Sequence, residues 1–139
     1  MNPAKISRKS RFKQGYYNAS RSSKYRGPSL QVPYRSSYEL KFILYCENNS
    51  NIVEWSYETL KIPYKGPTGK THRYFIDFII KYKDGSVYLI EVKPYNQTIP
   101  QENPEYRKNS LKWSAAKKYA ESNGYKFMIV TEKSLARMK

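Results

Sequence analysis

Three residues near the middle of the chain, Asp77, Glu91 and Lys93, are of types that could perform metal-assisted hydrolysis. They lie in the segment HRYFIDFIIKYKDGSVYLIEVKP, residues 72–94. This segment predicts two strands joined by a tight turn with the sequence KDG, because Gly readily takes the left-handed position of a three-residue hairpin loop. Alternate side chains of a strand point to the same face, so Glu91 and Lys93 lie together.

The predicted hairpin also places the two acids opposite each other. A three-residue loop pairs Tyr82 with Ser86, and counting back from that pair puts Asp77 across from Glu91. Cross-strand partners have Cβ atoms about 4.5–5.5 Å apart. Two carboxylates this close repel, so one pKa rises unless a cation lies between them, and a divalent metal held by carboxylate oxygens is the usual cation.

A structural ion cluster is the alternative interpretation of these residues. In it, Lys93 neutralises one of the two acids and no metal binds. An Asp among Ile and Phe in a strand is costly to bury without a specific partner, and strands disfavour Asp. The sequence therefore favours the chemical role of Asp77 over the structural one.

A third acid lies on the helix predicted over residues 36–48. Ser36 and Glu39 have the spacing of a capping box, in which the serine caps the helix and the acid folds back on the first turn. Glu39 thus has two interpretations, as part of the cap and as part of the site. Apolar side chains nearly all round the helix predict that it is buried in the core: Leu40, Phe42, Ile43, Leu44 and Cys46.

A helix acid, a strand acid and an acid–x–lysine motif, in this order, resemble the signature of the PD-(D/E)xK nucleases. Glu39, Asp77 and Glu91-Val92-Lys93 match that signature, although Ile76 stands where the name has Pro. Within this superfamily, residues 34–94 resemble the amino-terminal nuclease domain of the Tn7-type transposase endonuclease subunit. Size, the basic amino terminus and EVKP make the chain still more similar to the small head-completion nucleases of T-even-like phages.

The resemblance implies a Mg²⁺-dependent (or Mn²⁺-dependent) phosphodiesterase. Asp77 and Glu91 would bind the metal, helped by the backbone carbonyl of Val92 and by Glu39. Lys93 would position the attacking water or stabilise the transition state. The implied protein is a DNA endonuclease or DNA-end-processing nuclease that acts in phage head completion after packaging. Its expected location is the host cytoplasm during assembly and the virion head, with portal, neck or head proteins as partners.

Two other functions stay open. One is a non-catalytic DNA-binding virion or head protein with a vestigial nuclease site. The other is a transposase-type endonuclease subunit, which counts as weaker because no downstream domain follows in this sequence.

The charge of the chain predicts a polyanionic partner. The net charge is +15, from 26 basic and 11 acidic residues. Residues 1–35 contain no acid and no apolar periodicity, so we expect a basic arm that is disordered or ordered only on a partner. The arm would track DNA or dock on another protein. Expected DNA-contacting residues are Lys5, Arg8, Lys9, Arg11, Lys13, Arg21, Lys24, Arg26 and Arg35 of the arm, with Lys108 and Lys112 of a later helix.

Residue types that are scarce exclude several kinds of site. Cys46 is the only cysteine, so no internal disulfide forms, and His72 is the only histidine, which excludes a two-histidine zinc site. No apolar run reaches the 18 or more residues of a membrane span, so no membrane partner is expected. Oligomeric state is left open.

The remaining segments predict an α/β fold over residues 36–139. One or two extended segments are expected over 52–64, a helix from about 104 to 123, a strand over 125–131 and a last helical turn. A crossover helix between two strands of one sheet makes them parallel. The resulting order of helix, three strands, helix and strand is the restriction-endonuclease-like core expected of this superfamily.

Overall fold

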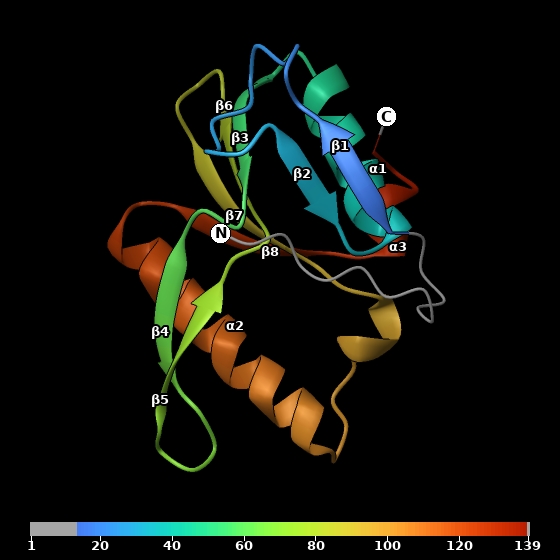
Figure 1. Cartoon of the computed structure of the whole chain (residues 1–139). Coiled ribbons are helices and arrows are strands. Elements are labelled where there is room, and N and C mark those ends of the chain that lie inside the picture. The colour runs from blue at the N-terminus through green and yellow to red at the C-terminus, as the bar shows by residue number, and fades with distance from the viewer. Residues whose placement is uncertain (1–13, 139) are drawn as a thin grey trace.

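A computed structural model describes residues 14–138 of the chain. Figure 1 shows its helices and strands, which follow one another in this order: β1 (Gly15–Asn18), β2 (Gln31–Tyr34), α1 (Ser37–Asn48), β3 (Ile52–Tyr57), β4 (Lys61–Lys65), β5 (Thr71–Phe75), β6 (Phe78–Tyr82), β7 (Val87–Val92), the 3₁₀-helix η1 (Tyr95–Gln97), α2 (Pro104–Ser122), β8 (Lys126–Val130) and α3 (Glu132–Leu135).

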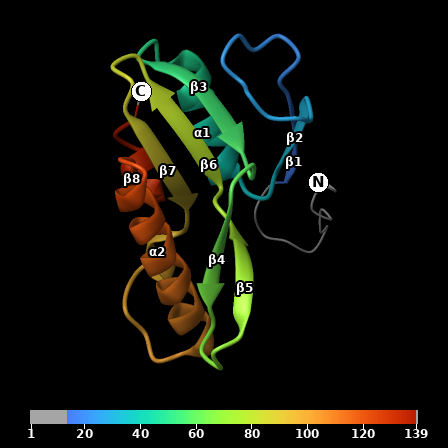
Figure 2. The same ribbon diagram turned by 90° about the vertical axis from the view of Figure 1, so that its left-hand side faces the viewer.

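A four-stranded sheet with the order β3-β6-β7-β8 forms the centre of the molecule, and Figure 2 shows its strands side by side. β3, β6 and β7 pair antiparallel, whereas β8 pairs parallel to β7. The parallel pair requires a crossover, and α2 provides it. The predicted α/β class and the order of the core elements are confirmed.

The turn between β6 and β7 has the predicted geometry. The Tyr82 amide donates to the Ser86 carbonyl at 2.9 Å, and Gly85 has a φ of 88°. Phe78 pairs with Ile90, so the predicted register holds along the whole hairpin. Only glycine takes such a φ without strain, which is why the KDG sequence fixes this turn.

The first strand of the predicted hairpin is interrupted, which differs from the expectation. β5 ends at Phe75 and β6 begins at Phe78, and β5 leaves the central sheet to pair with β4. Ile76 lies at the break, fully buried, with its amide donating to the Leu60 carbonyl at 3.2 Å. Asp77 therefore lies at the end of β6, where the backbone changes sheet, instead of in the middle of a strand.

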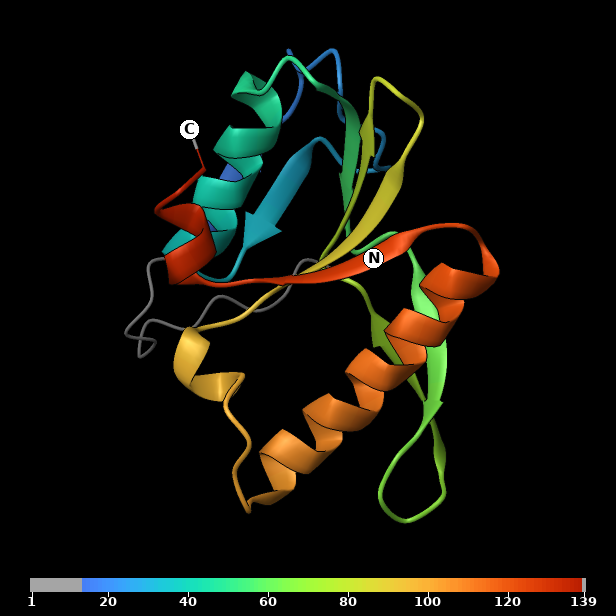
Figure 3. The ribbon, with the colours of Figure 1, turned by 180° about the vertical axis from the view of Figure 1, so that it is seen from behind.

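The central sheet separates two hydrophobic clusters. Figure 3 shows α1 and α2 on opposite sides of β8. Ile90 and Val92 of β7 pack with α1, whereas Leu89 packs with α2 and the β4–β5 hairpin. Because side chains alternate along a strand, Glu91 shares the α2 side of the sheet with Leu89.

Helix α1 begins as predicted, but its acid makes a different contact. The Ser36 hydroxyl accepts the Glu39 amide at 3.2 Å, whereas the Glu39 carboxylate accepts the amide of Arg35 at 2.7 Å. The reciprocal half of the capping box is thus shifted by one residue. The helix is also less buried than expected, because Leu44 is 42% exposed.

Residues 14–35 are folded, which corrects the expectation of a disordered arm for this part. β1 and β2 pair antiparallel, and Val32 is buried in the core on the α1 side. The ring of Tyr25 packs 4.8 Å from that of Trp55. These contacts bury apolar side chains, which the high charge of the segment did not lead us to expect. Residues 1–13, which hold Lys5, Arg8, Lys9, Arg11 and Lys13, lie outside the described residues. The division of the chain into an arm of residues 1–35 and a nuclease-like domain of residues 36–139 stays a prediction.

Lys24, which we expected to contact DNA, makes a structural contact within the protein. Its ammonium group donates to the carbonyls of Cys46, Glu47 and Asn49 at 2.8–3.0 Å. These carbonyls end α1, where helix carbonyls lack partners in the helix itself and a cation is favoured. Lys24 therefore stabilises the end of a core helix.

Among the described residues, no helix is both long enough and apolar enough to cross a membrane.

We predict that Lys24→Met lowers the free energy of unfolding by about 1–3 kcal/mol, because part-buried carbonyls at the end of α1 lose their donor. Urea denaturation followed by circular dichroism measures the change. Arg21→Met removes the same charge from an exposed position of the same loop and should leave the stability nearly unchanged. Equal stability of both variants would contradict the capping role of Lys24.

Candidate active site

Asp77 and Glu91 meet at the end of the central sheet. The pairing of β6 with β7 runs to Phe78 and Ile90, and one further step places Asp77 opposite Glu91. The Asp77 carboxylate accepts the Val92 amide at 2.8 Å, which fixes it against β7. The convergence predicted from the turn is therefore present in the structure, while the chemical roles of these residues stay predictions.

The two carboxyl groups have strongly perturbed acidity. Burial and then the neighbouring Glu91 and Glu39 carboxylates raise the pKa of Asp77 well above its usual range, against the opposing Val92 amide and Lys93 ammonium. Burial also raises the pKa of Glu91, and the charge of Lys93 opposes this. Two buried acids this close do not both ionise readily, so the pair retains a proton unless a cation joins it.

Glu39 reaches the same region from the start of α1. It is 6% exposed, and its carboxylate accepts the Arg35 amide at 2.7 Å and the Tyr57 hydroxyl at 3.2 Å. Burial raises the pKa of Glu39, and its charge in turn raises that of Asp77. Glu39 is therefore both part of the helix start and part of the acid cluster, so its two predicted interpretations are compatible.

A second layer of charges surrounds Glu39. The Arg35 guanidinium forms an ion pair with Glu58 and donates to the Tyr57 hydroxyl. Glu58 has a φ of 52°, unusual for a residue other than glycine, and its amide donates to the Asp77 carbonyl at 2.9 Å. Strained backbone of this kind concentrates at functional sites.

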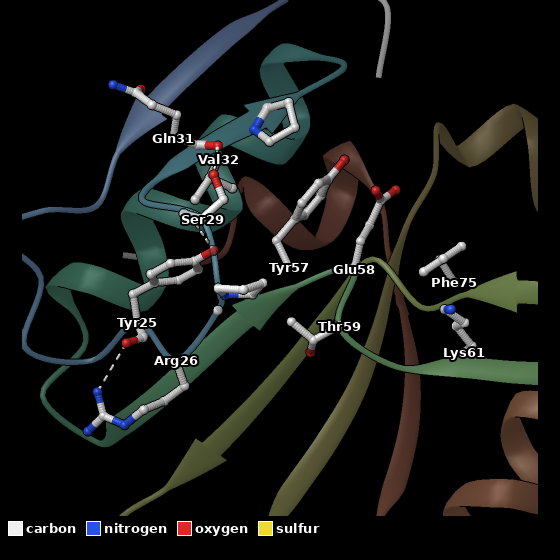
Figure 4. A pocket seen from close by; sticks show the side chains of 13 residues that line it. Tyr25, Arg26, Ser29, Gln31, Val32, Tyr57, Glu58, Thr59, Lys61 and Phe75 are labelled. Atoms are coloured by element: carbon white, nitrogen blue, oxygen red, sulfur yellow. Dashed lines mark hydrogen bonds between the residues drawn. The ribbon is translucent and has the colours of Figure 1, made fainter. Parts of the chain in front are cut away.

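Tyr57 and Glu58 also line a pocket of about 750 Å³ beside the acids. Figure 4 shows their side chains extending in the same direction from the end of β3, with Tyr25 and Arg26 on one side and Lys61 and Phe75 on the other. None of Asp77, Glu91 and Lys93 lines this pocket. The Tyr57 and Glu58 layer was missed by the sequence reasoning, because IVEWSYETL carries no motif that distinguishes it.

On the α2 side of the sheet, Lys112 approaches the acids together with Lys93. The Lys112 ammonium lies 5.5 Å from the centroid of the Tyr74 ring. Burial and the charges of Lys108 and Lys93 lower the pKa of Lys112, and Glu91 opposes this. Two lysines thus act on the same carboxylate, Lys93 from directly after β7 and Lys112 from α2, whereas Lys108 itself is exposed.

The described residues offer carboxylate oxygens of the kind that divalent metals prefer, although few of them. Within residues 14–138, no group of three or more His, Cys, Asp or Glu side chains is arranged to bind a metal. Mg²⁺ needs fewer, since proteins usually bind it with one or two carboxylates together with substrate phosphates and water. Glu91 Oε1 is buried without a hydrogen-bond partner, so an acceptor is available. The pair of Asp77 and Glu91 therefore fits Mg²⁺ or Mn²⁺, and the roles of Glu39 and of the Val92 carbonyl as ligands stay predictions.

Of the basic residues expected to bind DNA, three make local contacts within the protein. Lys24 binds the end of α1, and Arg35 pairs with Glu58. Arg26 lies 3.5 Å from Glu54 and donates to backbone carbonyls of its own loop. Arg21 is exposed. Lys24, Arg26 and Arg35 thus have partners within the protein, and DNA binding by these residues stays a prediction.

We predict that Asp77→Asn stabilises the metal-free protein at neutral pH. A raised folded-state pKa means that the stability contributed by protonated Asp77 is complete below its unfolded pKa and is lost as the pH rises through the folded pKa. Asn keeps an acceptor for the Val92 amide and does not ionise. Thermal unfolding with a chelator should show a higher melting temperature for the variant at pH 7, with the difference vanishing as the pH falls to about 4. A variant less stable than wild type at pH 7 would contradict the burial of an ionisable pair.

Comparison with known proteins identifies the family of this chain. Residues 49–132 match the family described as TnsA-like endonuclease N terminal, and this segment contains Asp77, Glu91 and Lys93. The chain is also 36% identical, over 130 residues, to the head completion nuclease of Enterobacteria phage T4, covering 81% of this chain and 87% of the phage protein. The expected resemblance to PD-(D/E)xK nucleases is confirmed, and the chain belongs to the TnsA-like endonuclease family.

Proposed function

We propose that this chain is a Mg²⁺-dependent or Mn²⁺-dependent DNA endonuclease that acts on DNA in phage head completion. The observation that carries the proposal is the meeting of Asp77 and Glu91, with Lys93 beside them, inside a segment that matches an endonuclease family. The similarity to the head completion nuclease of phage T4 supports the assignment of this activity to phage head completion. The protein would work in the host cytoplasm during assembly, with portal, neck or head proteins as its partners.

The side chains have separate parts in the proposed reaction. Asp77 and Glu91 would hold the metal, and when bound it supplies a Lewis acid for the phosphoryl oxygen and an acidified water. Lys93 offsets the negative charge of the two acids, which would otherwise repel the DNA phosphate. Its ammonium group also stabilises charge that develops on the phosphate in the transition state.

Lys112 would add a second cation on the α2 side of the same phosphate. Burial lowers the pKa of Lys112, and the repelling charges of Lys108 and Lys93 lower it further. A phosphate between Lys93 and Lys112 would relieve that repulsion, because two cations that face each other stabilise an anion between them. Lys108, which is exposed one turn earlier, would contact the backbone of the DNA farther from the acids.

We predict that Asp77→Asn, Glu91→Gln and Lys93→Ala each reduce nicking of a supercoiled plasmid by about 100-fold or more, since each loses a metal ligand or a transition-state donor. Gel electrophoresis of the plasmid with Mg²⁺ or Mn²⁺ measures the nicked product. Glu121→Gln, which neutralises an exposed acid on α2, is the matched control and should nick at the wild-type rate.

Two outcomes would count against the proposal. Nicking at the wild-type rate by all three variants would exclude this site as the catalytic one. DNA binding by a wild-type protein that never nicks, with either metal, would favour the alternative of a non-catalytic DNA-binding head protein.

A further prediction concerns residues 1–13, which carry five basic side chains. Deleting the whole basic segment up to Val32 would also remove Lys24, which binds the end of α1, and the buried side chain of Val32. Such a deletion would disturb the fold, so the informative deletion ends at Lys13. If two or three of the five basic side chains contact phosphates, the slope of log affinity against log salt on duplex DNA flattens by roughly 2–3 units, about 0.9 for each contact.

The deletion should weaken binding equally on unrelated sequences, because phosphate contacts carry no direct sequence information. Nicking at low salt should persist, since Asp77, Glu91 and Lys93 remain. Fluorescence anisotropy over a salt titration compares the deletion with the full-length chain. An unchanged slope would indicate that these basic residues dock on an acidic partner protein instead of DNA.

A further inference from the structure

Three buried polar atoms without hydrogen-bond partners gather on the α2 side of the sheet. They are Oε1 of Glu91, the hydroxyl of Tyr74 and Nε1 of Trp113. One is an acceptor, and the other two can donate. Buried polar atoms are nearly always paired in folded proteins, and each unpaired atom costs about 1–3 kcal/mol. Three of them together therefore point to a function.

The three side chains come from three elements that surround one point. Glu91 lies on β7, Tyr74 on β5 and Trp113 on α2. Tyr74 and Trp113 pack in the same hydrophobic cluster as Leu89, which shares its face of β7 with Glu91. Figure 1 shows α2 and the β4–β5 hairpin next to each other on this side of β7.

Both aromatic rings are held in place by neighbours. The Tyr74 ring packs edge-on against Tyr64, with centroids 6.4 Å apart, and Lys112 covers it at 5.5 Å. The Trp113 ring packs edge-on against Tyr106 with centroids 6.3 Å apart. The Tyr74 hydroxyl and the Trp113 indole N–H therefore cannot easily turn toward other hydrogen-bond partners.

The Tyr74 hydroxyl and the Trp113 indole both lie within reach of the Glu91 carboxylate as donors, and each opposes the rise in the pKa of Glu91. Neither of them forms a hydrogen bond of ordinary geometry to it. A small rotation of the carboxylate toward α2 would place Oε1 between the two donors. That rotation would leave the second oxygen facing Asp77, where the proposed metal would bind.

We infer that Tyr74 and Trp113 are positioning residues, which hold one oxygen of Glu91 from β5 and α2 so that the other is presented to the metal. The inference rests on the proposed function, because it concerns how a proposed metal ligand is oriented. Partners behind a metal ligand fix its orientation, and their loss typically reduces metal affinity 10- to 100-fold.

The decisive test measures Mn²⁺ binding by isothermal titration calorimetry in Tyr74→Phe and Trp113→Phe. Each substitution removes one donor and keeps an aromatic ring. Each should weaken Mn²⁺ binding by about tenfold or more. Tyr64→Phe is the matched control, because Tyr64 is buried in the same cluster and also loses only a hydroxyl, and it should bind Mn²⁺ as wild type does.

Thermal unfolding in the presence of a chelator separates positioning from a general structural role. Tyr74→Phe removes a buried, unpaired hydroxyl, so the metal-free variant should melt at a higher temperature than wild type while its Mn²⁺ affinity falls. A purely structural role would lower both quantities together.

Each outcome decides between the inference and the proposed function. Wild-type affinity in both Tyr74→Phe and Trp113→Phe would overturn the inference alone, as would an equal loss in Tyr64→Phe. A wild-type protein that binds no Mn²⁺ and nicks no DNA would overturn the proposed function as well.

Discussion

The hydrogen bond from the Val92 amide to the Asp77 carboxylate lies at the point on which the rest of the structure depends. It joins β6 to β7 one residue beyond their regular pairing, where the backbone leaves the central sheet for the β4–β5 hairpin. Because Asp77 terminates the pairing, its second oxygen is not needed by the backbone. A residue at the end of a strand can thus present a carboxylate while its neighbours Ile76 and Phe78 stay in the core.

Burial makes this arrangement unfavourable for the protein alone. Burial raises the pKa of all three acids, Asp77, Glu91 and Glu39. The charges of Glu91 and Glu39 raise the pKa of Asp77 further, although the net charge of the chain is +15. Two basic residues near β1 and β2 bind other groups: Lys24 binds the end of α1, and Arg35 pairs with Glu58. The acids therefore lack a full complement of cations in the fold itself, which is the property expected of a site that recruits a metal and a phosphate.

Local sequence determined which parts could be predicted. The KDG turn fixes the hairpin register, so the opposition of Asp77 and Glu91 followed from counting, and Ser36 marked the start of α1. The switch of β5 to another sheet could not be predicted, because residues 72–82 alternate as one continuous strand would. The folding of residues 14–35 could not be predicted either, because it depends on packing against Trp55, which is distant in the sequence. Tyr74 approaches Glu91 from another sheet and Trp113 from helix α2, so no spacing in the sequence connects them.

The two sides of the central sheet contribute different things to the site. From the α1 side come Glu39, Tyr57 and the Arg35–Glu58 pair, which form a network of ordinary hydrogen bonds and ion pairs. On the α2 side are Tyr74, Trp113 and Lys112, two unpaired donors and a cation that is already repelled by other lysines. The named side chains of the α1 side are thus paired with one another, whereas the two donors on the α2 side make no hydrogen bond of ordinary geometry. Under the proposed function, the DNA phosphate approaches from the α2 side, so substitutions at Trp113 and Lys112 change binding more than they change the fold.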